Sequence, residues 1–354
     1  MLGGAAMSAL GLRALGGRVA DRMMAAPRTT PEEARLGPEL DALGGEVLRL
    51  RSRDGLRLSA RWLPSEFASD WTTDPHEAIL LLHGWTGSIA PDIVEYGSFL
   101  RRTAGVLGLD FRGHGDSDDS PTTMGLREVD DVGGALAWLG ERGVTRVAVF
   151  GTSMGGITAL AAVTVLGDGS MPSADADPSA PAAVLAAPRP LIVGVVADSV
   201  FPELGYALVD RFPPWLRRPL ASLGFDEVAR RLGGDPRDTE PIRVVRLVDP
   251  VPLLLIHGDA DPRIPVRAAR ALAAAAGPSS DHWLVPGAAH AGAHRAEPDT
   301  YEGRVSGFLR RALADAREAA PIIAASSVVP AIRSVADPDD PVTELAPSGR
   351  LERD

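Results

Sequence analysis

Five short runs of apolar residues, separated by segments long enough to form helices, constrain the fold of this chain most. The runs are continuous rather than alternating, and they cover residues 78–82, 105–109, 144–150, 191–197 and 251–256. A strand that is apolar at every position is covered on both faces, as in a parallel sheet with helices on either side. The sequence therefore predicts an α/β fold with a mostly parallel, doubly wound sheet, whose ligand sites lie at the carboxyl ends of the strands.

Periodic segments beside these runs predict the neighbouring elements. Residues 125–143 carry apolar side chains at helical spacing, and residues 153–167 form an apolar stretch that indicates a second, buried helix. Before the first run, Asp54-Gly55 is typical of a two-residue hairpin turn, and apolar and polar residues alternate after it. We therefore expect an N-terminal antiparallel hairpin with one face exposed to water.

Composition divides the chain into a central domain and flanking segments. The chain has 354 residues, enough for one domain of about 250 residues with appendages. We expect a helical N-terminal extension over residues 1–44, an α/β domain over 45–314 and a disordered C-terminal tail over 315–354. Within the domain, residues 168–190 are rich in Pro, Ala and Ser, which predicts a flexible insertion.

An aromatic cluster follows the fourth apolar run, in residues 199–250. Its members are Phe201, Tyr206, Phe212, Trp215 and Phe225. Because they lie outside the predicted strands, the segment forms either a small helical lid over an apolar pocket or helices that pack on the core. We favour the lid, and we expect the first four of these aromatic side chains to bind the substrate.

Charge and residue usage exclude several classes of function. The chain has no cysteine, which excludes disulfides, thiolate metal sites and a cysteine nucleophile. All 36 basic residues are arginine, which excludes a catalytic lysine. The net charge of −11 argues against a nucleic-acid partner and favours a small neutral or apolar substrate. We expect neither a cofactor nor a metal, because the histidines lack the spacing of zinc ligands.

The N-terminal stretch is apolar but is interrupted by charges at Arg13, Arg18, Asp21 and Arg22. It therefore lacks the roughly 20 uninterrupted apolar residues of a membrane-spanning helix. It also lacks the basic start of a secretory signal. We expect a cytoplasmic protein whose N-terminal helix packs on the domain, with peripheral membrane contact through that helix as the alternative.

A serine between glycines follows the third apolar run and begins a predicted helix. In the stretch GTSMGG, a sharp strand-to-helix turn at Ser153 leaves no room for side chains at Gly151 and Gly155. The turn lifts the hydroxyl out of the sheet, and the helix start supplies N–H groups, including that of Met154, to a developing oxyanion. Ser153 is therefore the candidate nucleophile, and the alternative is a loop serine that caps a helix.

A serine nucleophile needs a base, and the base needs an acid to orient it. His290 follows an apolar run in a loop of small residues and is the candidate base, with His294 as its rival. Asp261 lies beyond a buried strand, in a loop that prolines stiffen, and is the candidate acid. Asp198 and Asp259, which also follow strands, are the alternatives.

Two further glycine loops follow the first two apolar runs. HGWTG, residues 83–87, brings the Trp85 N–H to a position from which it can face Ser153 across the sheet, as a second oxyanion donor. DFRGHGDS, residues 110–117, contains three polar residues of catalytic type, Asp110, Arg112 and His114. We attribute these three to glycine turns and an internal ion pair.

Together, the motifs resemble the α/β-hydrolase superfamily, and within it the esterase, lipase and serine-aminopeptidase-like branch. The motifs HGWTG, DFRGHGDS, GTSMGG, HGDADPRIP and PGAAH occur in the superfamily's order, within residues 45–314. The resemblance also implies a lid at 199–250. By position, it implies a nucleophile, a base, an acid and two oxyanion-hole donors, namely Ser153, His290, Asp261, Trp85 and Met154.

This resemblance implies a serine hydrolase of the carboxylesterase or lipase type, which cleaves a small apolar acyl ester through an acyl-serine intermediate. Thioester cleavage, acyl transfer and aminopeptidase activity share that intermediate and stay open as alternatives. A non-catalytic module that binds a ligand is the alternative from another class. The motifs assign no role to residues 1–44 and leave the oligomeric state open.

Overall fold

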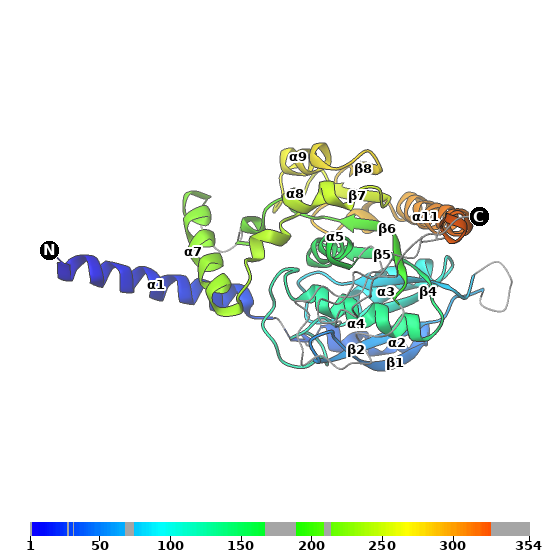
Figure 1. Ribbon diagram of the computed structural model, residues 1–354, viewed down its shortest axis with the longest axis horizontal. Helices are drawn as coiled ribbons and strands as arrows, with labels where there is room; N and C mark the ends of the chain where they lie inside the picture. Colours follow the sequence, from blue (N-terminus) through cyan, green and yellow to red (C-terminus); the bar gives the residue numbers. More distant parts are fainter. Residues whose placement is uncertain are drawn as a thin grey trace, which may run out of the picture. The chain divides into compact units, whose positions relative to one another are not determined.

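The strands form one sheet, in a computed structural model that describes residues 2–26, 28–30, 32–67, 74–166, 189–208 and 214–326. The strand order is β1-β2-β4-β3-β5-β6-β7-β8 (Figure 1). Only the β1–β2 and β2–β4 pairs are antiparallel. The strand bounds are β1 Glu46–Arg51, β2 Arg57–Leu63, β3 Glu77–Leu82, β4 Gly105–Leu109, β5 Arg146–Thr152, β6 Leu191–Asp198, β7 Leu253–Gly258 and β8 Ser280–Val285. The predicted α/β-hydrolase fold, with a mostly parallel sheet and an N-terminal hairpin, is confirmed.

Helices connect the parallel strands, as the alternation of the sequence predicts. The α-helices are α1 Leu2–Met24, α2 Gly37–Leu43, α3 Ala90–Leu100, α4 Glu128–Glu141, α5 Met154–Leu166, α7 Pro214–Leu232, α8 Pro241–Val244, α9 Val266–Ala275, α10 Ala293–Ala296 and α11 Pro298–Ser326. The 3₁₀-helices are η1 Glu33–Leu36, η2 Leu204–Leu208, η3 Pro236–Thr239 and η4 Val245–Val248. The predicted helices at 125–143 and 153–167 correspond to α4 and α5.

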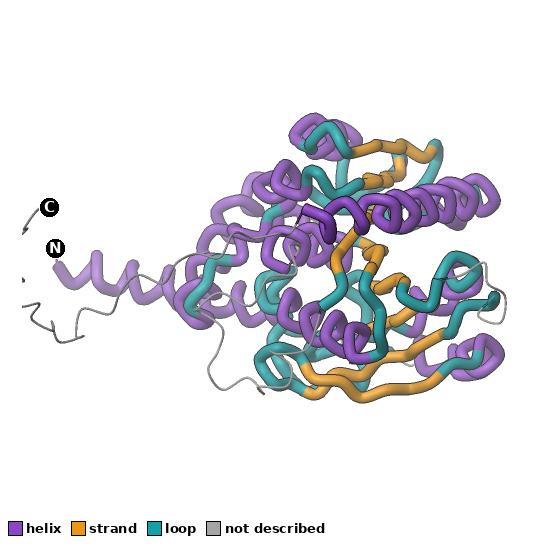
Figure 2. Tube along the Cα trace, turned by 45° about the vertical axis from the view of Figure 1, so that its right-hand side comes forward, coloured by secondary structure: helices purple, strands orange, loops and turns teal. Residues whose placement is uncertain are grey.

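The apolar strands are buried on both faces, and the alternation of side chains along β3 shows how. Leu80 and Leu82 point into a core cluster that includes residues of α4 and α5, whereas Ile79 and Leu81 point into a second cluster with α3 and α11. Figure 2 shows helices on both sides of the strands. Each such fully buried side chain contributes about 1.5–3 kcal/mol to folding. Continuous apolar runs are therefore the expected sequence of these strands.

The predicted hairpin is present, but its second face is not simply exposed to water. Ser59 of β2 is buried, and Arg61 donates from Nη1 to the carbonyl oxygens of Leu40 and Gly44, at 3.4 and 3.1 Å. The N-terminal extension thus lies over this face of the hairpin. The expectation of one wet face is correct only in part, because the sequence of the hairpin does not show what covers it.

The N-terminal helix α1 packs against α7, beside which it lies in Figure 1. A Cβ added at Gly224 would lie 2.7 Å from Val19 Cγ1 and 2.6 Å from Met23 Sδ, so the two helices approach closely at this glycine. Asp21 forms an ion pair with Arg231 of α7. This agrees with the expected helix that packs on the domain. Among the described helices, none has the length and apolar character needed to cross a membrane.

The predicted C-terminal tail and the predicted insertion have different outcomes. Disorder from residue 315 is wrong for residues 315–326, because α11 continues to Ser326. This stretch is rich in alanine, which favours helices. Its composition resembles that of the rest of the tail, so composition alone did not reveal the helix. Residues 327–354 and almost all of the insertion predicted at 168–190 lie outside the described residues.

Candidate active site

Ser153 occupies the sharp turn between β5 and α5. Its φ is +50°, a left-handed conformation that a residue with a side chain rarely adopts. A Cβ at Gly155 would collide with the Leu82 backbone and lie 2.8 Å from the His83 carbonyl oxygen, and one at Gly151 would lie 2.5 Å from the nitrogen of residue 156. The turn therefore requires glycine at both positions and holds Ser153 beyond the carboxyl end of β5.

Ser153, His290 and Asp261 form a continuous chain of hydrogen-bonding distances. His290 Nε2 lies 3.1 Å from Ser153 Oγ, and His290 Nδ1 lies 2.8 Å from Asp261 Oδ2. The three residues come from three loops, after β5, β8 and β7, which open at the same edge of the sheet. The structure thus brings together the three residues that the sequence singles out as nucleophile, base and acid.

The Asp261 carboxylate is buried and held by its own loop. Its Oδ1 accepts hydrogen bonds from the backbone N–H groups of Arg263 and Ile264, at 2.8 and 3.0 Å. Burial alone would raise the pKa of Asp261, but hydrogen bonds and charge attraction, above all those of His290, lower it below the ordinary value. Asp261 is therefore a carboxylate at neutral pH and accepts the proton on His290 Nδ1.

The rival base, His294, lies in a different environment. Its ring nitrogens lie 3.4 Å from Glu95 Oε1 and 3.5 Å from Glu302 Oε1, and the ring packs among Tyr96, Phe99 and Tyr301. The Glu95 carboxylate, followed by that of Glu302, raises the pKa of His294. His294 is thus an ion-paired side chain under the histidine loop.

The rival acids serve other groups. Asp198 accepts a hydrogen bond from the Tyr301 hydroxyl at 2.7 Å and another from Ser199 Oγ at 2.8 Å. Burial raises the pKa of Asp198. Asp259 Oδ1 accepts the backbone N–H of Gly287 at 2.6 Å. The carboxylate within hydrogen-bonding distance of His290 Nδ1 is that of Asp261, not that of Asp198 or Asp259.

The predicted oxyanion loop lies next to Ser153 because β3 and β5 are neighbours in the sheet. A Cβ at Gly84 would lie 3.5 Å from Ser153 Cβ, which places the start of HGWTG against Ser153. Trp85 follows directly. On the other side of Ser153, Met154 is the first residue of α5, and the N–H groups at a helix start lack partners within the helix.

His83, at the end of β3, is buried and neutral. Its Nδ1 lies 2.6 Å from the Gly84 carbonyl oxygen, and its Nε2 accepts the Phe111 N–H at 3.1 Å. These partners assign the proton to Nδ1. Burial, with the nearby His114, lowers the pKa of His83 well below its ordinary value. His83 thus ties the oxyanion loop to the loop after β4.

Arg112 and Asp110 of DFRGHGDS have structural roles, as expected, but the expected ion pair inside the loop is wrong, because Arg112 pairs with Asp131 of α4 and with Asp54 of the hairpin turn. Arg112 donates from Nη2 to Asp131 Oδ1 and from Nη1 to Asp54 Oδ2, both at 2.8 Å. Asp110 Oδ1 accepts the Ile89 N–H at 2.7 Å. Arg112 and Asp110 therefore stabilise the turns around the oxyanion loop.

The segment expected to form a lid contains α7, α8 and three 3₁₀-helices between β6 and β7. Of its predicted substrate-binding residues, Phe201 is 6% exposed and lies in the larger core cluster, against which Tyr206 packs. Trp215 is 76% exposed. Phe212 lies outside the described residues. The three described aromatic residues thus range from core to surface.

Sequence reasoning missed a residue that links the catalytic loops. Ser199 Oγ accepts the Ala291 N–H at 2.9 Å, directly after His290, while the Ser153 N–H donates to the Asp198 carbonyl oxygen at 2.8 Å. Ser199 and Ala291 both have positive φ, at +56° and +50°. The stretch VVADSVF gave a signal for Asp198 only, since nothing in it marks the left-handed serine.

Within the described part of the chain, no group of three or more His, Asp or Glu side chains could hold a metal ion.

Comparisons with known proteins identify the family of the chain. Residues 79–304 match the model of the alpha/beta hydrolase family. YfhR of Salmonella typhimurium, an uncharacterized protein, is 25% identical over 275 residues, which cover 76% of this chain and 80% of YfhR. YqkD of Bacillus subtilis, also uncharacterized, is 26% identical over 261 residues, or 70% of this chain and 77% of YqkD.

Solved structures of similar fold include an esterase and a protein with bound ferulic acid. The Pyrococcus furiosus esterase Pf2001 is 21% identical, with a TM-score of 0.54 over 82% of this chain and 98% of its own. Est1E of Butyrivibrio proteoclasticus, solved with ferulic acid, is 18% identical, with a TM-score of 0.53 over 75% of this chain and 99% of its own. Because the family model matches more than half of the residues, this chain belongs to the alpha/beta hydrolase family.

Proposed function

We propose that the protein is a serine hydrolase that cleaves carboxylic esters through an acyl-serine intermediate. The observation that carries the proposal is the chain from Ser153 Oγ through His290 to Asp261, with distances of 3.1 and 2.8 Å, on a turn that holds Ser153 at φ +50°. A hydroxyl, an imidazole and a carboxylate in this order form the constellation that activates a serine for acyl transfer.

In the first half of the reaction, Ser153 Oγ attacks the ester carbonyl carbon while its proton passes to His290 Nε2. The carbonyl oxygen becomes an oxyanion, which we assign to the backbone N–H groups of Trp85 and Met154. When the intermediate collapses, the bond to the leaving alcohol breaks and His290 returns the proton to the alcohol oxygen. Asp261 stabilises the imidazolium throughout and stays ionised.

In the second half, a water molecule replaces the alcohol. His290 takes a proton from the water as its oxygen attacks the acyl carbon, and a second oxyanion forms at the same N–H groups. Breaking the bond to Ser153 Oγ then releases the acid, and His290 returns the proton to Ser153. The overall reaction converts an ester and water into an acid and an alcohol, with atoms and charge balanced.

The segment between β6 and β7 is where we place selection of the substrate. On this segment, Phe201 belongs to the core cluster that contains Met154, and Tyr206 packs against that cluster. We therefore infer that an apolar acyl group is the class of substrate that suits this side of Ser153. Thioesters, acyl acceptors other than water and N-terminal peptide bonds pass through the same acyl-serine, so they are the alternatives to test.

The test is labelling of the purified protein with a fluorophosphonate, followed by turnover assays with acyl esters, thioesters and aminoacyl anilides. We expect stoichiometric labelling of the wild type and none of Ser153→Ala, with hydrolysis of short or medium acyl esters that Ser153→Ala lacks. Labelling that persists in Ser153→Ala would refute the nucleophile. Failure of the wild type both to label and to turn over any substrate would favour a non-catalytic, ligand-binding module.

A further inference from the structure

The N-terminal extension reaches the oxyanion loop through Glu33, which lies outside the residues that match the family model. Glu33 Oε1 accepts the N–H of Gly87 at 2.8 Å, across 54 residues of sequence. The other oxygen, Oε2, accepts the Thr30 N–H at 2.8 Å, and Thr30 Oγ1 accepts the Glu33 N–H at 3.1 Å. This reciprocal pair fixes the carboxylate, which is 9% exposed, in the orientation that meets Gly87.

Gly87 is held from both sides, and its lack of a side chain makes this possible. Its N–H goes to Glu33, and its carbonyl oxygen accepts the Gly115 N–H at 2.7 Å. A Cβ at Gly87 would collide with the Glu33 carboxylate and lie 2.6 Å from the Arg28 carbonyl oxygen and 2.8 Å from Thr29 Cα. The close approach of the N-terminal segment therefore requires glycine here.

Arg28 gives the same segment a second attachment. Its Nη1 donates to the carbonyl oxygens of Gly115 and Ser117, at 3.0 and 3.1 Å, and its guanidinium pairs with Asp119. The loop that contains Gly115 also binds Gly87. Arg28 and Glu33, the oxyanion loop and the loop after β4 are thus joined in one closed set of contacts.

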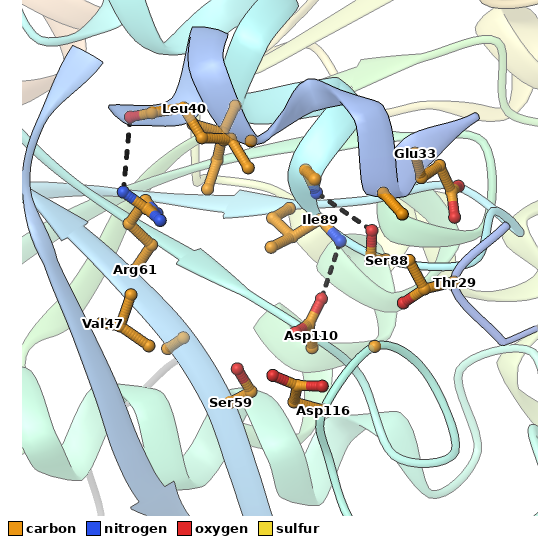
Figure 3. A pocket seen from close by; sticks show the side chains of 16 residues that line it. Thr29, Glu33, Leu40, Val47, Ser59, Arg61, Ser88, Ile89, Asp110 and Asp116 are labelled. Atoms are coloured by element: carbon orange, nitrogen blue, oxygen red, sulfur yellow. Dashed lines mark hydrogen bonds between the residues drawn. The ribbon is translucent and has the colours of Figure 1, made fainter. Parts of the chain in front are cut away.

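The close-up in Figure 3 shows where the segment lies. Thr29 and Glu33 of the N-terminal segment lie beside Ser88 and Ile89, with Asp110 below them. All five line a cavity of about 250 Å³ between the extension and the α/β domain. The extension is therefore in direct contact with the loop after β3, on the side where the cavity lies.

The oxyanion loop has few means of fixing its own conformation. It contains two glycines and no helix or strand. Its internal hydrogen bonds include those from His83 Nδ1 to Gly84 O at 2.6 Å, from Thr86 N–H to Gly84 O at 2.8 Å and from Thr86 Oγ1 to Ser88 O at 2.9 Å, and none of these reaches Gly87. Gly84 packs against Ser153. A shift at Gly87 is therefore transmitted over two residues to the peptide that faces the nucleophile.

We propose that Glu33 is a positioning residue for the oxyanion hole: its carboxylate, by binding the Gly87 N–H, holds residues 83–88 where the Trp85 N–H meets the oxyanion formed at Ser153. The inference rests on the proposed function for its catalytic consequence. It gives Glu33 a role that the family motifs do not contain.

The test compares Glu33→Ala with Glu32→Ala, a neighbouring exposed glutamate whose loss changes the charge equally. Loss of a direct oxyanion donor costs 10²–10³ in kcat, so an indirect displacement should lower kcat of Glu33→Ala by about 10–100-fold, with KM changed less than about threefold. Glu32→Ala should stay within about twofold of the wild type. Glu33→Gln keeps one acceptor oxygen for the Gly87 N–H but presents an NH₂ group to the Thr30 N–H, so it should recover part of the lost kcat.

A second readout does not depend on turnover. Hydrogen–deuterium exchange of a peptide that covers residues 83–88 should be faster in Glu33→Ala than in Glu32→Ala, at a temperature where circular dichroism shows both variants folded. The proposal would be overturned if Glu33→Ala had the same exchange rate and the same kcat as Glu32→Ala. It would also be overturned if exchange were faster in Glu33→Ala while its kcat stayed undiminished. Loss of kcat in Glu33→Gln equal to that in Glu33→Ala would also overturn it, since the Gly87 bond would then not be what matters.

The two proposals fail in different ways. If Ser153→Ala retains the wild-type rate, or the wild type has no activity, the proposed function fails. The exchange rates still decide in that case whether Glu33 holds the loop. If Ser153-dependent activity is present and Glu33→Ala retains it fully, only the role of Glu33 fails.

Discussion

His290 Nδ1 lies 2.8 Å from Asp261 Oδ2, and this single relationship assigns the proton of the imidazole. A carboxylate only accepts hydrogen bonds, so Nδ1 carries the proton and Nε2, 3.1 Å from Ser153 Oγ, is left to accept one. Asp198, another buried carboxylate at this edge, instead accepts from Tyr301 and Ser199. The two aspartates therefore have separate partners: Asp261 contacts His290, whereas Asp198 contacts Tyr301 and Ser199.

Asp261→Asn should retain the fold and lose most of the activity. The amide can present its NH₂ group to His290 Nδ1, which would favour the wrong tautomer and remove the charge that stabilises the imidazolium. In serine proteases the equivalent change lowers kcat by about 10⁴, and we expect a loss of about that size here. Steady-state hydrolysis of an acyl ester measures it.

Asp198→Asn should show the opposite pattern and so serves as the control. Asparagine has one acceptor oxygen where Asp198 accepts from both the Tyr301 and Ser199 hydroxyls. One buried donor would lose its partner, which costs about 1–3 kcal/mol of stability, whereas kcat should fall less than about tenfold. Urea denaturation and the same ester assay give both values. Equal losses of kcat in the two variants would contradict the assignment of Asp261 as the acid.

His294 should stabilise the fold in a pH-dependent way without acting as the base. Glu95 and Glu302 raise its folded-state pKa above the ordinary value of 6.5. The folded state thus binds the proton more tightly than the unfolded state, so the stabilisation is complete below about pH 6.5 and is lost as the pH rises through the folded-state pKa.

We therefore expect His294→Gln to be less stable than the wild type at about pH 5.5 and to approach it at about pH 9. Urea denaturation at the two values measures the difference. His294→Gln should retain kcat within about tenfold, in contrast to His290→Ala. A loss of activity in His294→Gln as large as that in His290→Ala would mean that the base has been assigned to the wrong histidine.

The sequence was sufficient for the inner parallel strands and for the residues at their ends. Continuous apolar runs identify β3 to β7, because burial on both faces allows few polar residues. The edge strand β8 was missed because its sequence, SDHWLV, is only partly buried and alternates. Edge strands lack the cover on both faces that makes an apolar run necessary.

The contacts that hold the site from outside could not be predicted. Glu33 and Gly87 are 54 residues apart, and neither the charge of one nor the small size of the other indicates its partner. Ser199 depends on a left-handed backbone that sequence shows only for glycine. A linear motif marks residues that react, whereas residues that position them are recognised only once the chain is folded.

Asp92, on the first turn of α3, should make the protein less stable as the pH rises. Burial, with the nearby carboxylates of Glu95 and Glu33 adding to it, raises the pKa of Asp92 from 3.8 to about 8. Between these two values the folded state holds a proton that the unfolded state has released, so the free energy of unfolding falls as the pH rises.

Asp92→Asn removes this dependence, because the amide stays neutral at every pH. The variant should match the wild type near pH 4 and exceed it in the free energy of unfolding by an amount that grows up to about pH 8. Urea denaturation across this range measures the difference. Parallel stability curves for the two proteins would show that Asp92 has an ordinary pKa.

Gly155→Ala should damage the turn at the nucleophile, because its Cβ would collide with the Leu82 backbone and the His83 carbonyl oxygen. These are backbone atoms of β3 and the oxyanion loop, so no side chain can rotate away to make room. Overpacking of this kind costs about 1–3 kcal/mol, and the displaced loop should lower kcat as well.

Gly303→Ala on α11 is the matched control, since no heavy atom lies within 4 Å of its added Cβ. Alanine in an open helical position should raise stability by about 0.4–1 kcal/mol and leave kcat unchanged. Urea denaturation and ester hydrolysis on both variants separate the two cases. Gly155→Ala as stable and as active as Gly303→Ala would contradict the prediction. The loop after β3 would then have to be displaced without cost. Its close contact with the turn at Ser153 could not, in that case, be what holds the oxyanion site.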